Sequence, residues 1–274
     1  MRDRPPPSAE LTMHTIDDDL ELAMRLADAA RERSLFYFRR ELQQWSKGDG
    51  SLATEADLAV EDELRGRLAV ERPGDAVLGE ERGQTGESTR CWIIDGIDGT
   101  IDFAAGDPDW GTLIALEIDG QVVLGVCDQP VHKRRYWAIR SGGAFFADDG
   151  ATPTRLQSST HADFATARSY LPPPHWVPDG ISQAIGNALK AATRPEPQAD
   201  HPAIQVALGS SEFAVFFLMG PWDIAAPALI VEEAGGRFSD FSGRFSIRSG
   251  SAVFSNGVVH DEILALVSSV RTST

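Results

Sequence analysis

The chain has 274 residues, of which 42% are hydrophobic and 24% are charged, and its formal net charge at pH 7 is −16. This composition is typical of a globular protein with enough material for one large domain or two of ordinary size. The acidic balance argues against binding to nucleic acid, because contact with a phosphate backbone needs clustered lysine and arginine. No run of about 18 consecutive apolar residues occurs, so we expect neither a transmembrane helix nor a membrane partner.

The start of the chain is rich in proline and lacks the apolar core of a secretory signal, so residues 1–14 are expected to form a disordered tail. Cys91 and Cys127 lie in apolar, strand-like runs. Lone thiols in such runs are more often buried and free than joined in a disulfide, which favours a reducing compartment and predicts a cytoplasmic protein. The six histidines show no metal-type spacing, which counts against zinc.

Apolar residues at helical spacing predict a first helix over residues 15–40 and a second over 54–70. Thr54, followed three residues later by Asp57, resembles a capping arrangement at the start of the second helix. Capping as the only role of Asp57 and a further role in a functional site both remain open at this point.

Short strands follow, at 91–94, 112–118, 122–126, 135–139 and 144–146. The dipeptide Asp119-Gly120 is a strong hairpin signal, and consecutive hairpins make an antiparallel sheet. We therefore expect residues 15–155 to form an α+β domain with an antiparallel sheet.

Beyond about residue 155 the pattern changes. Helices are expected at 181–192, 201–208, 222–234 and 260–270, and strands at 214–218, near 238 and at 252–254. Strands that alternate with helices indicate an α/β domain over residues 156–274.

Residues 92–100 read Trp-Ile-Ile-Asp-Gly-Ile-Asp-Gly-Thr. Asp95 comes at the end of an apolar strand, and Asp98 follows in a turn flanked by glycines. Because glycine permits tight backbone approach, this turn can direct both carboxylates and the carbonyl group of Ile97 to one point.

Gly99 and Thr100 then present backbone N–H groups where a helix is expected to start, which is a ready anion site. A calcium-binding EF-hand loop would need oxygen ligands at its third and twelfth positions. Counted from Asp95, these positions are Ile97 and Gly106, so that interpretation fails.

Two further acidic segments are Gly79-Glu80-Glu81 and Trp222-Asp223, the latter at the start of an apolar helix. Asp223 can cap that helix and still serve as a ligand. Hard divalent cations such as Mg²⁺ select carboxylate and carbonyl oxygen and share their shell with a substrate phosphate. The acidic motifs together therefore indicate a metal-dependent phosphatase. We expect the second domain to contribute Asp223 to its site.

These segments resemble the motifs of the inositol monophosphatase superfamily. Residues 92–100 are similar to W-I-x-D-P-[IL]-D-G-T, and residues 222–236 are similar to W-D-x-A-A-x-x-x-[IV]-x-E-A-G-G. The Glu-Glu pair and Thr54-x-x-Asp57 also stand in the family's order. The resemblance implies a two-domain, layered αβαβα sandwich of the inositol monophosphatase and fructose bisphosphatase type. It also implies a Mg²⁺-dependent phosphomonoesterase with two to three ions, and we expect a homodimer.

The resemblance further implies roles for single residues. The metal ligands would be Glu80, Asp95, the Ile97 carbonyl, Asp98 and Asp223. The attacking water would be positioned and deprotonated by Thr100 with Glu80 or Asp57, and the amides of Gly99 and Thr100 would bind phosphate. Substrate contacts would come from Asp98, Asp102, Leu218 and Asp223.

Several local strings look most like the histidinol-phosphatase branch of actinobacterial type, namely 72–75, 134–138, 255–257 and 260–262. The sequence departs from the family pattern in three places. Gly96 replaces the usual proline, and Ile101-Asp102 replaces a polar residue followed by Asn. Leu218 stands where the inositol branch has an acidic residue that binds substrate hydroxyls, which disfavours inositol.

L-histidinol phosphate is accordingly the expected substrate. An inositol or sugar monophosphate and a 3′-phosphoadenosine-type nucleotide remain alternatives. A non-catalytic descendant that only binds metal or ligand is a fourth possibility, but such a protein has no need of the water-activating Thr100.

Overall fold

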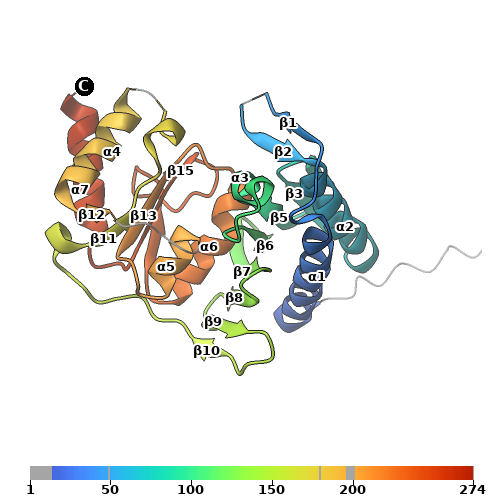
Figure 1. The fold of residues 1–274 in the computed structure, drawn as a ribbon. Coiled ribbons are helices and arrows are strands. Elements are labelled where there is room, and N and C mark those ends of the chain that lie inside the picture. The colour runs from blue at the N-terminus through green and yellow to red at the C-terminus, as the bar shows by residue number, and fades with distance from the viewer. Residues whose placement is uncertain (1–13, 49, 179, 196–200, 274) are drawn as a thin grey trace, which may run out of the picture.

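The computed structural model describes residues 14–48, 50–178, 180–195 and 201–273. The expected disordered tail, apart from His14, lies outside the described residues. Helices and sheets alternate in five layers, so that two sheets are each covered on both faces by helices (Figure 1). The αβαβα fold class implied by the motifs is confirmed.

The first layer contains α1 (Ile16–Tyr37) and α2 (Glu55–Glu71). Between them lies a small hairpin of β1 (Gln44–Ser46) and β2 (Leu52–Thr54). Both predicted helices are present, and each begins with a capping box in which an aspartate binds the backbone of a threonine three residues earlier. The first helix ends at residue 37 instead of 40, because the next residue is extended and Arg39 has a left-handed φ of 60°.

The larger sheet has eight strands in the order β10-β9-β8-β7-β6-β5-β3-β4. Their bounds are β3 Ala76–Gly79, β4 Gly83–Thr85, β5 Arg90–Asp98, β6 Gly111–Ile118, β7 Gln121–Gln129, β8 Arg134–Ile139, β9 Gly143–Asp148 and β10 Thr154–Arg155. All neighbours are antiparallel except β3 and β5, which are parallel. The expectation of a purely antiparallel sheet is therefore wrong for this one pair, because the chain leaves β3 for the outer strand β4 and then returns to the inner side of β3.

The second sheet has five strands in the order β12-β11-β13-β15-β14. Their bounds are β11 Arg168–Tyr170, β12 Arg194–Pro195, β13 Phe213–Phe217, β14 Arg237–Ser239 and β15 Ser251–Ser255. The sheet is mixed, since β11 runs parallel to β12 and β13 while β15 is antiparallel to β13 and β14. Its outer face is covered by α4 (Ile181–Ala192) and α7 (His260–Ser273), as Figure 1 shows.

The middle layer consists of α5 (Pro202–Ala207) and α6 (Pro221–Glu233). Residues Ile224 to Val231 of α6 are all buried, as expected of a helix that is apolar on every side and packed between two sheets. Apolar residues from both sheets share one core cluster with α6. The start of α6 lies between the sheets (Figure 1). The domain boundary near residue 155 stays a prediction.

None of the helices over the described ranges is long and apolar enough to cross a membrane. Both cysteines are free and buried, as predicted.

Candidate active site

The acidic loop forms where the pairing of β5 with β6 becomes irregular. Asp95 pairs with Leu113 and Asp98 with Gly111, so the register shifts between the two aspartates. A bulge of this kind re-aims side chains at the end of a strand. Asp95 is only 3% exposed, and its Oδ1 accepts the N–H of Ile97 at 3.0 Å. The loop thus holds one carboxylate in a fixed position before any ion is considered.

Gly99 ends the loop and begins the short helix α3 (Thr100–Ala105), as the sequence predicts. Its φ is 87°, and a Cβ at this position would lie 3.3 Å from the Asp109 carbonyl oxygen and from the Trp110 side chain. The left-handed backbone and the close contacts both favour glycine. The turn brings the Thr100 hydroxyl back to within 3.3 Å of the Ile97 carbonyl oxygen.

Asp57 caps α2 and also contacts Thr100. Its Oδ2 accepts hydrogen bonds from the Thr54 N–H at 2.8 Å and from the Thr54 hydroxyl at 2.6 Å. Its Oδ1 accepts the Thr100 hydroxyl at 2.8 Å. The cap of α2 therefore also fixes the direction of the Thr100 hydroxyl proton, which leaves the Thr100 oxygen able to accept a hydrogen bond from a third group.

Glu80, Asp95 and Asp223 come together from three segments, and each offers an oxygen within 4.8 Å of the other two. Glu80 follows β3, and Asp223 lies in the first turn of α6, where it also accepts the Gly220 N–H at 2.7 Å. Burial, and then the neighbouring carboxylates, raise the pKa of Asp95 and of Asp223 well above the ordinary value. Burial raises the pKa of Glu80 and brings that of Asp98 to about 6.

Half-buried and buried carboxylates that repel one another fit a cation, and their oxygen atoms are the ligands that hard divalent ions prefer. The predicted ligands Glu80, Asp95 and Asp223 thus form a group that could hold a metal ion. Asp98 is near enough to raise the pKa of Asp223. That Asp98 and the Ile97 carbonyl also bind the ion stays a prediction.

Lys47 is a site residue that the sequence reading missed. It follows β1, and its Nζ lies 2.7 Å from Glu80 Oε1 and also contacts Glu81. Burial opposes its charge, but the hydrogen bonds that Lys47 donates to the two glutamates outweigh burial and raise its pKa. Strands of three residues give too weak a periodic signal to reveal this hairpin.

His201 is a second residue that was missed. Its Nδ1 accepts the Ala203 N–H at 3.2 Å and caps α5, while its Nε2 lies 3.6 Å from Asp98 Oδ2. The imidazole ring packs beside Phe216, which in turn packs against Tyr170. Burial, followed by the charge of Asp98, raises the pKa of Tyr170 to about 12. An aromatic wall therefore faces Asp98, and only the fold reveals it.

The two remaining substrate-binding candidates lie at the margin. Asp102 is on α3, and burial together with the nearby acidic groups raises its pKa. Leu218 lies one residue beyond β13, has a φ of 57° and is 78% exposed. The strand expected at 214–218 therefore ends one residue earlier, and Leu218 lies just outside it. Substrate contact by Asp102 and Leu218 stays a prediction.

Comparison with known proteins agrees with the geometry. Residues 16–272 match the inositol monophosphatase family over nearly the whole chain. The chain belongs to the inositol monophosphatase family. The predicted family and the predicted enzyme class, a phosphoric monoester hydrolase, are confirmed.

Two relatives of this family member are named histidinol-phosphatase. It is 40% identical over 251 residues to a histidinol-phosphatase of Mycobacterium tuberculosis, covering 90% of this chain and 96% of the relative. It is also 40% identical over 256 residues to a histidinol-phosphatase of Streptomyces coelicolor, with the same coverage. Among solved structures, an IMPase of Thermotoga maritima superimposes with a TM-score of 0.80 at 28% identity, covering 93% of this chain and 99% of the other.

Proposed function

We propose that this chain is a Mg²⁺-dependent phosphatase that hydrolyses L-histidinol phosphate. The observation that carries the proposal is the acidic group Glu80, Asp95 and Asp223, together with the hydrogen bond between Thr100 and Asp57 of α2. A protein that only binds an ion needs the carboxylates but not the oriented threonine.

The chemistry of such a site divides between the ions and the chain. Bound Mg²⁺, in two to three sites, would lower the pKa of a water molecule, neutralise phosphate charge and stabilise the leaving oxygen. The Thr100 hydroxyl donates a hydrogen bond to Asp57, so its oxygen is free to accept a hydrogen bond from the attacking water and to orient it. Asp57 or Glu80 would take the proton of that water, and the amides of Gly99 and Thr100 would bind the phosphate oxygens.

The choice of substrate rests on the leaving group. L-histidinol carries an ammonium group and an imidazole ring. Asp98 offers negative charge, and the wall beside it offers the rings of His201, Phe216 and Tyr170. Carboxylates bind an ammonium group, and aromatic faces bind both cations and planar rings. Two relatives at 40% identity are named histidinol-phosphatase. Leu218 offers no acceptor for the hydroxyls of a polyol.

A release assay for inorganic phosphate tests the proposal. Purified protein in Mg²⁺ is compared on L-histidinol phosphate, myo-inositol 1-phosphate, sugar monophosphates and adenosine 3′,5′-bisphosphate. We expect the highest kcat/KM for L-histidinol phosphate and complete loss of activity with a chelator. A higher kcat/KM for any other compound in the panel would overturn the assignment of L-histidinol phosphate as the substrate. Full activity in excess chelator would overturn the metal requirement. The homodimer and the cytoplasmic location remain predictions, and sedimentation of the purified protein tests the first.

A further inference from the structure

The turn that carries Glu80 is held by a residue outside the acidic group. Only residues 80–82 separate β3 from β4 at the edge of the larger sheet. The side chain of Glu61, on α2, reaches this turn from the neighbouring layer. Its Oε2 accepts the backbone N–H of Glu81 at 2.7 Å, and its Oε1 accepts the backbone N–H of Arg82 at 3.0 Å.

Glu61 is completely buried, so its charge must be balanced within the protein. Arg65, one helical turn later, provides that balance through a contact of 2.6 Å between its Nε and Glu61 Oε1. Arg65 also donates to the Gly83 carbonyl and to the Thr85 hydroxyl, which belong to β4. The pair therefore binds both the turn and the strand that follows it.

Two glycines make room for this arrangement. A Cβ on Gly79 would lie 2.5 Å from Glu61 Oε1, closer than any real contact allows, so only glycine lets the carboxylate reach the turn. A Cβ on Gly96 would lie 3.1 Å from the Glu61 backbone nitrogen, which shows how closely α2 packs on the acidic loop. Glu61 is thus fixed between the segment that carries Asp95 and the turn that carries Glu80.

We infer that Glu61 is a positioning residue that holds Glu80 in register with Asp95 and Asp223 and so sets the affinity of the site for a divalent cation. This inference rests on the proposed function only because the proposed function names Mg²⁺ as the cation. Asp57 and Glu61 lie four residues apart on α2, so one helix face orients both the Thr100 hydroxyl and the Glu80 turn. Both carboxylate oxygens of Glu61 are engaged by the backbone of Glu81 and Arg82 and by Arg65, so Glu61 acts by holding the turn.

The substitution Glu61→Gln tests the inference, because it keeps the shape of the side chain but replaces one acceptor oxygen by a donor. One of the two backbone N–H groups then loses its partner. We expect the affinity of the metal-free protein for Mg²⁺, and for Mn²⁺ as a second probe, to fall at least about tenfold in calorimetry, as for other residues that orient metal ligands. The loss in kcat at saturating Mg²⁺ should be smaller than the loss in affinity.

Glu63→Gln is the matched control, since Glu63 pairs with Arg67 in the same i,i+4 geometry on the same helix but at the surface. Its cation affinity should equal that of the wild type. If Glu61→Gln fails to fold, Gly79→Ala displaces the same carboxylate and should lower the affinity in the same way.

Unchanged cation affinity in a folded Glu61→Gln or Gly79→Ala protein overturns the inference, even if the melting temperature falls, because a purely structural role predicts that result. Failure of the proposed function looks different. In that case the wild type binds the cation and the variant binds it more weakly, but no phosphate is released from any substrate.

Discussion

At the scale of single residues, the site carboxylates are fixed by short-range contacts with the backbone. Asp95 accepts the Ile97 N–H and Asp223 accepts the Gly220 N–H, each within three residues along the chain. Side chains held in this way lose little conformational freedom when an ion or substrate binds, which favours both affinity and rate.

Asp95→Asn should remove most of the activity while leaving the fold intact. Asparagine can still accept the Ile97 N–H, but it lacks the negative charge that stabilises cations at the reacting phosphate. We expect kcat to fall by at least about 10²–10³-fold, the loss seen when one stabilising group of a transition state is removed. Steady-state kinetics with a circular dichroism spectrum of the variant provide the check. A folded variant with more than about a tenth of wild-type kcat contradicts the assignment.

Leu218 tests the substrate side of the site. If it stands where an acceptor for polyol hydroxyls would be needed, kcat/KM for myo-inositol 1-phosphate should be at least about tenfold below that for L-histidinol phosphate, since an unpaired hydroxyl costs about 1–3 kcal/mol. Leu218→Glu should narrow this difference. Val70→Glu is a suitable control, because Val70 is equally exposed, at 79%, and lies on the far end of α2. Equal effects of the two substitutions would show that Leu218 does not contact substrate.

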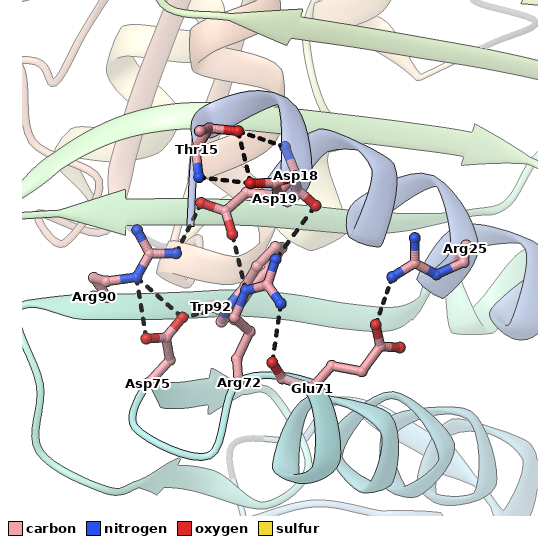
Figure 2. Close-up of polar contacts among 9 residues, drawn as sticks. All are labelled: Thr15, Asp18, Asp19, Arg25, Glu71, Arg72, Asp75, Arg90 and Trp92. Atoms are coloured by element: carbon pink, nitrogen blue, oxygen red, sulfur yellow. Dashed lines mark hydrogen bonds and ion pairs between the residues drawn. The ribbon is translucent and has the colours of Figure 1, made fainter. Parts of the chain in front are cut away.

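At the scale of elements, a buried network of charges joins α1 to the end of α2 and the start of β5 (Figure 2). Asp19 is 1% exposed and accepts hydrogen bonds from Arg72 at 3.0 Å and from Arg90 at 2.8 Å. Arg90 and the indole N–H of Trp92 also bind Asp75. Because β5 ends in the acidic loop, this network anchors the strand at the end opposite to the site.

Asp19→Ala should destabilise the protein strongly, because Arg72 would be left buried without its partner. Removing one member of a buried pair typically costs about 3–5 kcal/mol. Denaturant unfolding measures the loss, with Asp17→Ala as the control, since Asp17 is exposed in the same helical turn and should cost less than about 1 kcal/mol. Similar losses for the two variants would contradict a dominant role for the network.

His260 predicts how stability depends on pH. It begins α7, is fully buried, and shares hydrogen bonds of 2.8 Å with the hydroxyls of Ser239 and Ser255. Burial, and then the charge of Arg237, lower its pKa from 6.5 to about 4. The unfolded chain therefore takes up a proton between pH 6.5 and 4 that the folded protein does not, so this contribution to stability is present above pH 6.5 and is lost as the pH falls.

The difference in free energy of unfolding between pH 7.5 and pH 4 should be about 3 kcal/mol larger for the wild type than for His260→Asn, since each unit of pKa shift is worth about 1.4 kcal/mol. Denaturant unfolding at the two pH values measures it. Equal pH dependence of wild type and variant would show that His260 does not titrate in this way.

At the scale of the whole molecule, the long elements could be predicted and the short ones could not. α4 occupies the residues that its apolar spacing predicts, and the strands around Asp119-Gly120 form the expected hairpin. The sequence alone did not reveal the contacts of Lys47 and Glu61. Lys47 follows a three-residue strand, and Glu61 resembles any charged residue on an amphipathic helix. Contacts across layers, such as His201 with Asp98, depend on tertiary packing that one sequence does not encode locally.

The motifs that supply Asp95 and Asp223 are separated by more than a hundred residues, and the two carboxylates meet where α6 packs in one core with both sheets. Contacts this distant in sequence form slowly and late, because the intervening chain must first be closed into a loop. During synthesis the N-terminal half can leave the ribosome with half of the acidic site exposed and no high-affinity place for an ion. Cation capture should then mark the last stage of maturation, and the mature enzyme would acquire its ions only after the C-terminal half has been made.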